Sequence, residues 1–303
     1  MKKFVIHIGW KLKPVSGAYI LYLDDEKENI ENVYDLIPGN YLNIRITEPL
    51  KKFCVGFSAS NREHIPCPTG ELVESNRMQC QSCSFNEFYI CRALCQGDFC
   101  HPSSEAAKEH CWETTASVYL THIAGKIKVG SSTHPLRRWL GQGSDAGICI
   151  AEGVGLAPRA LEHQIGSKLS LPLAIRINQK MKYLGKAIDK DTIITEMQAV
   201  IDEIYNSMQS EILLPRDELK EITFLDSYHG NINQIDARPQ IKKITEDVFE
   251  LSGKIVGVKG NILVLKNGAT YYTTNLSNFI GLYVELSEEK SEMKGQKSLF
   301  DFV

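Results

Sequence analysis

The chain has 303 residues, 43% of them hydrophobic and 23% charged, and a formal net charge of −3 at pH 7. This length is enough for two or three domains with real cores, and the composition is ordinary for a globular protein. The apolar runs all fall short of the about 18 residues that predict a membrane span, which argues against a membrane protein.

The first part of the chain is predicted to be rich in β-strands, and the part that follows is rich in cysteine. Apolar and polar residues alternate over residues 3–24, which predicts two strands joined by a turn at Pro14–Gly17. Strands are also expected on both sides of Pro38-Gly39-Asn40. Residues 1–60 are therefore predicted to form a small N-terminal β domain, and residues 61–113 a loop-rich segment dominated by cysteines.

The second half begins with a mixed module. Residues 116–130 predict a β-hairpin that turns at Ala124-Gly125, and Pro135 and Pro158 each open a helix. The module spans 114–186, a helical acidic region spans 187–251, and residues 252–287 predict a small β unit. A polar tail follows at 288–303. The expected fold class is α+β.

Charge differs sharply between neighbouring regions. Residues 117–186 contain ten Lys/Arg and three Asp/Glu, a net charge of +7, whereas residues 187–254 contain seven and fourteen, a net charge of −7. A positive module beside a negative one favours a polyanion-binding surface on the first. The alternative is chance clustering on solvated faces.

Cysteines are concentrated in one segment. The chain begins like a β-strand and not like a signal peptide, so we expect an intracellular, cytoplasmic protein whose thiols stay reduced. Clustered cysteines then favour metal binding. Seven of the nine cysteines fall within 45 residues: Cys67, Cys80, Cys83, Cys91, Cys95, Cys100 and Cys111.

This cysteine pattern predicts one or two structural zinc ions. One partition places Cys91, Cys95, Cys100 and Cys111 around a single ion, because four thiolates satisfy tetrahedral zinc. The other pairs Cys80-Gln-Ser-Cys83 with two ligands chosen from Cys54, Cys67 and His64. An iron–sulfur cluster and a set of buried free thiols are the alternatives, and His101 and His110 beside the cysteines tilt the prediction toward zinc.

The predicted hairpin and the helices after it carry a family resemblance. Ser117-Val118-Tyr119, followed by Lys128-Val129-Gly130, resembles the paired strands of the GIY-YIG nuclease superfamily. The resemblance, over about residues 116–175, implies a catalytic arginine on the next helix and a metal-binding glutamate on a later one; Arg137 and Glu162 match these positions. The order of a β region, paired cysteines, K-V-G and R-W-x-x-Q-G over about 1–285 also resembles a prokaryotic, archaeal-like zinc-binding family of unknown function.

The nuclease resemblance implies metal-dependent phosphodiester hydrolysis. Glu162 would hold Mg²⁺ or Mn²⁺, Arg137 would neutralise the phosphoryl oxygens, and Tyr119 would orient or deprotonate water. Lys128 stands where the nucleases have tyrosine, so it is either a phosphate contact, a base or a sign of lost cleavage. Further nucleic-acid contacts are expected from Lys126, Arg138 and Arg159.

The last eight residues resemble the PCNA-interacting peptide, or PIP box, that docks into sliding clamps. Gln296, Leu299, Phe302 and Val303 match its pattern, although Val303 replaces the usual second aromatic residue. Leu299, Phe302 and Val303 would form an apolar plug on a single helical turn. The alternative is a tail that folds back onto its own domain.

Together these features predict a clamp-recruited DNA repair protein that contains zinc. We expect a structure-specific endonuclease, associated with the nucleoid through its clamp. The first alternative is a DNA-binding adaptor that has lost cleavage, and the second is an RNA-binding or RNA-processing protein.

Overall fold

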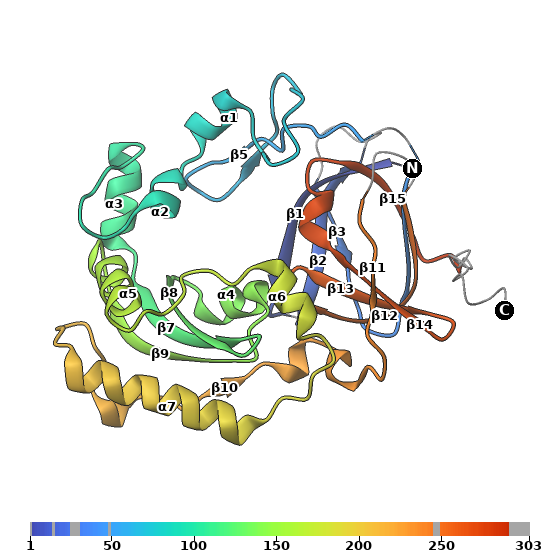
Figure 1. Cartoon of the computed structure of the whole chain (residues 1–303). Coiled ribbons are helices and arrows are strands. Elements are labelled where there is room, and N and C mark those ends of the chain that lie inside the picture. The colour runs from blue at the N-terminus through green and yellow to red at the C-terminus, as the bar shows by residue number, and fades with distance from the viewer. Residues whose placement is uncertain (1, 14–15, 25–30, 48–49, 245–248, 291–303) are drawn as a thin grey trace.

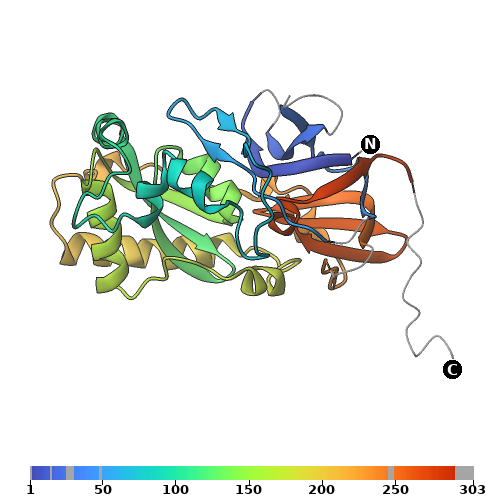
Figure 2. The same ribbon diagram turned by 90° about the horizontal axis from the view of Figure 1, so that it is seen from above.

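The computed structural model describes all residues except 1, 14–15, 25–30, 48–49, 245–248 and 291–303. Figure 1 shows a curled β-sheet on one side, a mixed module on the other, and the cysteine-rich segment arching between them. In Figure 2 the sheet and the module lie side by side. Within the described residues, no helix is long and apolar enough to cross a membrane.

The larger sheet has nine strands drawn from both ends of the chain. Their spatial order is β11 (Gln240–Ile241), β14 (Thr270–Asn275), β13 (Ile262–Asn267), β12 (Phe249–Lys259), β4 (Tyr41–Ile46), β15 (Tyr283–Ser287), β1 (Lys2–Lys11), β2 (Gly17–Asp24) and β3 (Glu31–Asp35). The strand pair around Pro14–Gly17 is therefore confirmed. Strands β3 and β4 do flank Pro38-Gly39-Asn40, but they do not pair with each other: β3 pairs with β2, and β4 pairs with β12 and β15.

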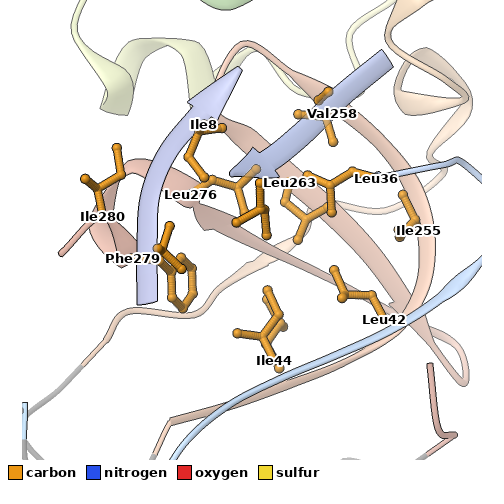
Figure 3. Packing of buried hydrophobic residues seen from close by; sticks show 14 of the residues in the cluster. Ile8, Leu36, Leu42, Ile44, Ile255, Val258, Leu263, Leu276, Phe279 and Ile280 are labelled. Atoms are coloured by element: carbon orange, nitrogen blue, oxygen red, sulfur yellow. The ribbon is translucent and has the colours of Figure 1, made fainter. Parts of the chain in front are cut away.

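The two β regions that were predicted as separate units belong to this one sheet. Strand β4 pairs antiparallel with both β12 and β15, so residues 1–60 and 252–287 share a ladder. Arg45 and Glu250 form an ion pair at 2.7 Å across the joint. Figure 3 shows apolar side chains such as Ile44, Leu263 and Phe279 pointing into the common interior.

The module is built on a second sheet, of the order β10 (Thr223–Phe224), β9 (Ala146–Gly153), β7 (Ala116–Ile123) and β8 (Lys126–Ser132). The hairpin of β7 and β8 is confirmed, and it turns at Ala124 and Gly125, whose φ angles of 51° and 73° are left-handed. Strand β9, which the sequence did not predict, pairs with the other edge of β7.

Helices complete the module and the cysteine-rich segment. The module carries α4 (Pro135–Gln142), α5 (Ala157–Lys168), α6 (Ile177–Lys182) and α7 (Lys190–Ser207). The cysteine-rich segment carries β5 (Phe57–Ser58), β6 (His64–Ile65), α1 (Gln81–Asn86), α2 (Ile90–Leu94) and α3 (Glu105–Glu113). The rest of the predicted helical acidic region, from 208 to 244, contains short 3-10 turns and strands.

Apolar spacing explains how α7 covers the module. Ile193, Met197, Ile201 and Ile204 are all buried against the second sheet, while Ile194 on the outer face is 42% exposed. This is the i, i+4, i+8 stripe of an amphipathic helix.

The module and the curled sheet meet at a close backbone junction. Nε2 of His229 lies 2.8 Å from the carbonyl of Ser144, just before β9. The His229 ring lies edge-on to Trp10 of β1, whose indole N–H donates within the curled sheet to the Gly260 carbonyl at 3.1 Å. A Cβ on Gly143 would lie 3.0 Å from the Gly260 nitrogen, so glycine permits this approach. The junction fixes the start of β9 and the end of α4 against the sheet.

Candidate functional site

Four cysteines converge in the first part of the cysteine-rich segment and just before it. The sulfur atoms of Cys54, Cys67, Cys80 and Cys83 all lie within 4.8 Å of one another. Tetrahedral zinc with sulfur ligands at 2.3 Å requires sulfur separations of about 3.8 Å, and Cys67 and Cys80 are 4.0 Å apart. These four residues, here called the zinc cysteines, could therefore bind a structural metal such as zinc.

The chain around the zinc cysteines is already arranged for thiolates. Sγ of Cys54 accepts backbone N–H groups of Gly56 at 3.4 Å and Cys80 at 3.2 Å. Sγ of Cys80 caps α1 by accepting the Cys83 N–H at 3.5 Å. Hydrogen bonds of this kind stabilise a metal-bound thiolate and orient it.

Electrostatic effects differ among the zinc cysteines. Burial opposes ionisation of the Cys67 thiol, but hydrogen bonds from the Thr69 hydroxyl and from the backbone of Glu71 outweigh it and lower the Cys67 pKa to about 6. Burial raises the pKa values of the Cys54 and Cys83 thiols. A bound cation would reverse these two shifts by stabilising the thiolates.

The structure selects between the ligands that the sequence left open. His64 does not join the zinc cysteines, because its Nε2 is hydrogen-bonded to the Val55 carbonyl and its Nδ1 lies 3.2 Å from Glu31. Cys91, Cys95, Cys100 and Cys111, here called the second quartet, lie apart from the zinc cysteines. Among the described residues they do not form a compact metal-sized group.

On the module, Tyr119 and Gly130 face each other across the hairpin. They are register partners, and a Cβ on Gly130 would lie 2.5 Å from the Tyr119 hydroxyl, so the ring lies over the glycine. That hydroxyl donates to Oε1 of Gln142 at 3.4 Å. Burial raises the Tyr119 pKa, with Glu162 adding to the effect and Arg138 opposing it. The phenol therefore stays protonated at neutral pH. Its one hydrogen is donated to Gln142, and its oxygen is left as an acceptor that can orient a water molecule.

Lys128 is buried in the same region. Its ammonium donates to the carbonyls of Val129 and Leu173, each at 2.9 Å. Burial lowers the Lys128 pKa to about 8; Glu162 opposes the shift, and the cations Arg138, Lys180 and Arg159 contribute to it. Its charge state therefore changes close to neutral pH.

Glu162 is the carboxylate among these groups and is 7% exposed. Its Oε2 accepts the Ser131 hydroxyl at 2.7 Å and Nη1 of Arg159 at 2.9 Å. Ser131 belongs to β8 and Arg159 to the first turn of α5. The carboxylate is thus held between the hairpin and α5.

Arg138, which like Arg137 is exposed, is the arginine of α4 that acts on these groups in the described interactions. Arg138 acts electrostatically on Tyr119, Lys128 and Lys180. Arg137 is exposed one position earlier on α4, and Lys126 is exposed at the start of β8. Lys128, Arg138, Arg159 and Lys180 are here called the basic cluster.

Sequence reasoning missed three polar residues of this site. Ser131 holds Glu162, Gln142 accepts from Tyr119, and the Lys180 ammonium donates to the Gln142 backbone carbonyl at 2.8 Å. Gln142 lies within the quoted R-W-x-x-Q-G run and could have been found there. Lys180 lies on α6 and carried no sequence signal of its own.

A comparison with known protein families adds one finding. The family described as a protein of unknown function (DUF2797) matches residues 42–284. The chain belongs to this family. No curated protein and no solved structure matches it.

The DUF2797 match includes all the groups described above. It takes in the zinc cysteines, the second quartet and the basic cluster, together with Tyr119 and Glu162. It ends before the predicted clamp peptide at Gln296, Leu299, Phe302 and Val303, and these four residues also lie outside the described part of the structure.

Proposed function

We propose that this DUF2797 protein is a zinc-containing, clamp-recruited DNA-processing enzyme whose 114–186 module hydrolyses phosphodiesters as GIY-YIG nucleases do. The observation that carries the proposal is the charge of the site. In the described residues, Arg138, Arg159 and Lys180 act electrostatically on the buried Lys128, together with the carboxylate Glu162. Such an excess of cations favours a phosphate ligand.

The order of the elements supports a nuclease-like module. Tyr119 and Gly130 lie on paired strands, α4 follows with Arg138, and Glu162 lies on the later helix α5. This is the order that the sequence resemblance implies. Arg138, and not its neighbour Arg137, would bind the phosphate, because Arg138 acts electrostatically on Tyr119 and Lys128.

The residues fit a mechanism with few parts. Both hydrogen bonds described for Glu162 end on Oε2, and its Oε1 is a hard oxygen ligand of the kind that Mg²⁺ prefers. A divalent ion held there would stabilise the negative charge that develops on the leaving oxygen. Arg138 would bind the phosphoryl oxygens with its planar fork, and Tyr119 would orient the attacking water.

A second function, DNA binding without cleavage, is favoured by one contact. The Lys128 ammonium is held by the Val129 and Leu173 carbonyls, which suits a fixed cation better than a mobile base. In that case the same basic cluster holds DNA, and the protein acts as an adaptor of the clamp.

Binding and cleavage can be separated with three variants. Arg138→Ala should weaken binding of labelled DNA. It should also lower the slope of log affinity against log salt concentration by about one, the amount expected for one lost phosphate contact. Glu162→Ala should abolish cleavage in Mg²⁺ or Mn²⁺ while nearly preserving affinity. Glu203→Ala, which removes an exposed carboxylate on α7, is the matched control. Equal cleavage by the Glu162 and Glu203 variants would remove Glu162 from the mechanism.

A further inference from the structure

The second quartet surrounds an apolar cavity. Cys91, Cys95, Cys100 and Cys111 all line one cavity of about 430 Å³ beneath α2 and α3. We propose that this cavity holds an iron–sulfur cluster ligated by these four cysteines. Fe–S clusters are bound by four cysteine thiolates, and no other cysteine lines the cavity.

The spacing of the sulfur atoms separates the two cysteine sites. The sulfur atoms of the zinc cysteines all lie within 4.8 Å of one another, whereas the second quartet forms no such group among the described residues and lines a cavity. A single zinc ion would need all four sulfur atoms about 3.8 Å apart. A cluster places several metal and sulfide atoms between its ligands, so its cysteines stand around a cavity.

The other walls of the cavity suit a cluster. Most of their exposed area is apolar, although Asp98, His101 and Lys108 also line the cavity. Leu94 and Phe99 line it and are 74% and 68% exposed. A bound cluster would fill the space beside them, and the apolar surroundings would limit solvent access to it.

The cavity also touches the module. Leu156, at the N-terminus of α5, lines it, and the Cys111 thiol lies 3.8 Å from the Gly155 carbonyl. Gly97 packs so tightly on α5 that a Cβ there would lie 2.1 Å from the Ala160 nitrogen. The cluster would therefore brace the first turns of α5, which carry Arg159 and Glu162.

The test is metal analysis of the full chain handled without oxygen. The protein is purified anaerobically, treated with ferric iron, sulfide and dithiothreitol, desalted, and assayed for iron, acid-labile sulfide and zinc. We expect equal iron and sulfide, about two or four of each per chain, with visible charge-transfer absorption and one zinc. The iron count then gives the cluster type.

Single cysteine variants assign the ligands. Cys95→Ser and Cys100→Ser should each lose most of the iron and the visible absorption while zinc stays at one per chain, which also shows that the protein is folded. Cys80→Ser should lose zinc and keep iron. Cys149→Ser, in β9 and outside both groups, is the control. Two zinc ions per chain with no iron after reconstitution would overturn the proposal, as would full iron retention in both Cys95→Ser and Cys100→Ser.

Discussion

Replacing Asp145 by asparagine should destabilise the joint between the module and the curled sheet. The carboxylate accepts Nδ1–H of His122 at 3.0 Å and the Ala124 N–H at 3.1 Å, and it pairs with the Lys259 ammonium from β12. Burial would raise its pKa, but His122 and Lys259 outweigh burial and lower the Asp145 pKa to about 2.

The size of the effect follows from that pKa. The ordinary value is 3.8, so the folded state favours the charged form. The resulting stability is present above about pH 4 and is lost as the pH falls toward 2. A pKa lowered by one pH unit corresponds to about 1.4 kcal/mol, so the lowered pKa contributes about 2.5 kcal/mol to the free energy of unfolding at pH 7. Asparagine also leaves the partly buried Lys259 ammonium, whose side chain is 12% exposed, without its counter-charge, so we expect a total cost of about 3 kcal/mol.

Denaturant unfolding at pH 7 measures this cost. The control is Asp202→Asn, which removes a half-exposed carboxylate paired with Arg216 at 2.7 Å and should cost less than about 1 kcal/mol. Adding Lys259→Met to Asp145→Asn should recover part of the loss, because no buried charge is then unpaired. If Asp145→Asn costs no more than Asp202→Asn, the joint does not depend on this carboxylate.

Four further outcomes are expected. Cys83→Ser should lose the zinc and expose the cysteine-rich segment to proteolysis, since zinc binding drives the folding of such segments; retained zinc would contradict the ligand set. DNA affinity should fall from pH 7 to 9 as the Lys128 amine, with its pKa near 8, loses its proton, and Lys128→Met should flatten that profile. Gly130→Ala should lower the melting temperature, because its Cβ would lie 2.5 Å from the Tyr119 hydroxyl; an unchanged value would show that the ring can move. Deleting residues 296–303 should end clamp binding without lowering the melting temperature, and a large drop would show that the tail folds back.

Local features of the fold could be predicted from the sequence. The turn at Ala124-Gly125 and the buried stripe of α7 depend on neighbouring residues, and the structure has both. The pairing of β4 with β12 could not be predicted, because it joins residues about 200 positions apart. The apolar run of β9 lacks the alternation that identifies a half-buried strand.

The site was partly predictable for similar reasons. Cys80 and Cys83 were clear from their spacing, but Cys54 joins them through folding of the chain and not through a local motif. The choice between Arg137 and Arg138 depends on the rotation of α4, which two adjacent arginines do not reveal. Lys180 reaches the basic cluster from a helix about 50 residues after Lys128.

We propose that the 114–186 module cleaves DNA with Glu162 and the basic cluster. The most direct measurement is single-turnover cleavage of labelled flap, fork, nicked and duplex DNA and a folded RNA, in Mg²⁺ or Mn²⁺, with and without a PCNA-type clamp. We expect clamp-stimulated cutting of one DNA structure by the wild type and by Glu203→Ala, and none by Glu162→Ala. DNA binding without cutting by any of the three would contradict the claim and leave the adaptor function.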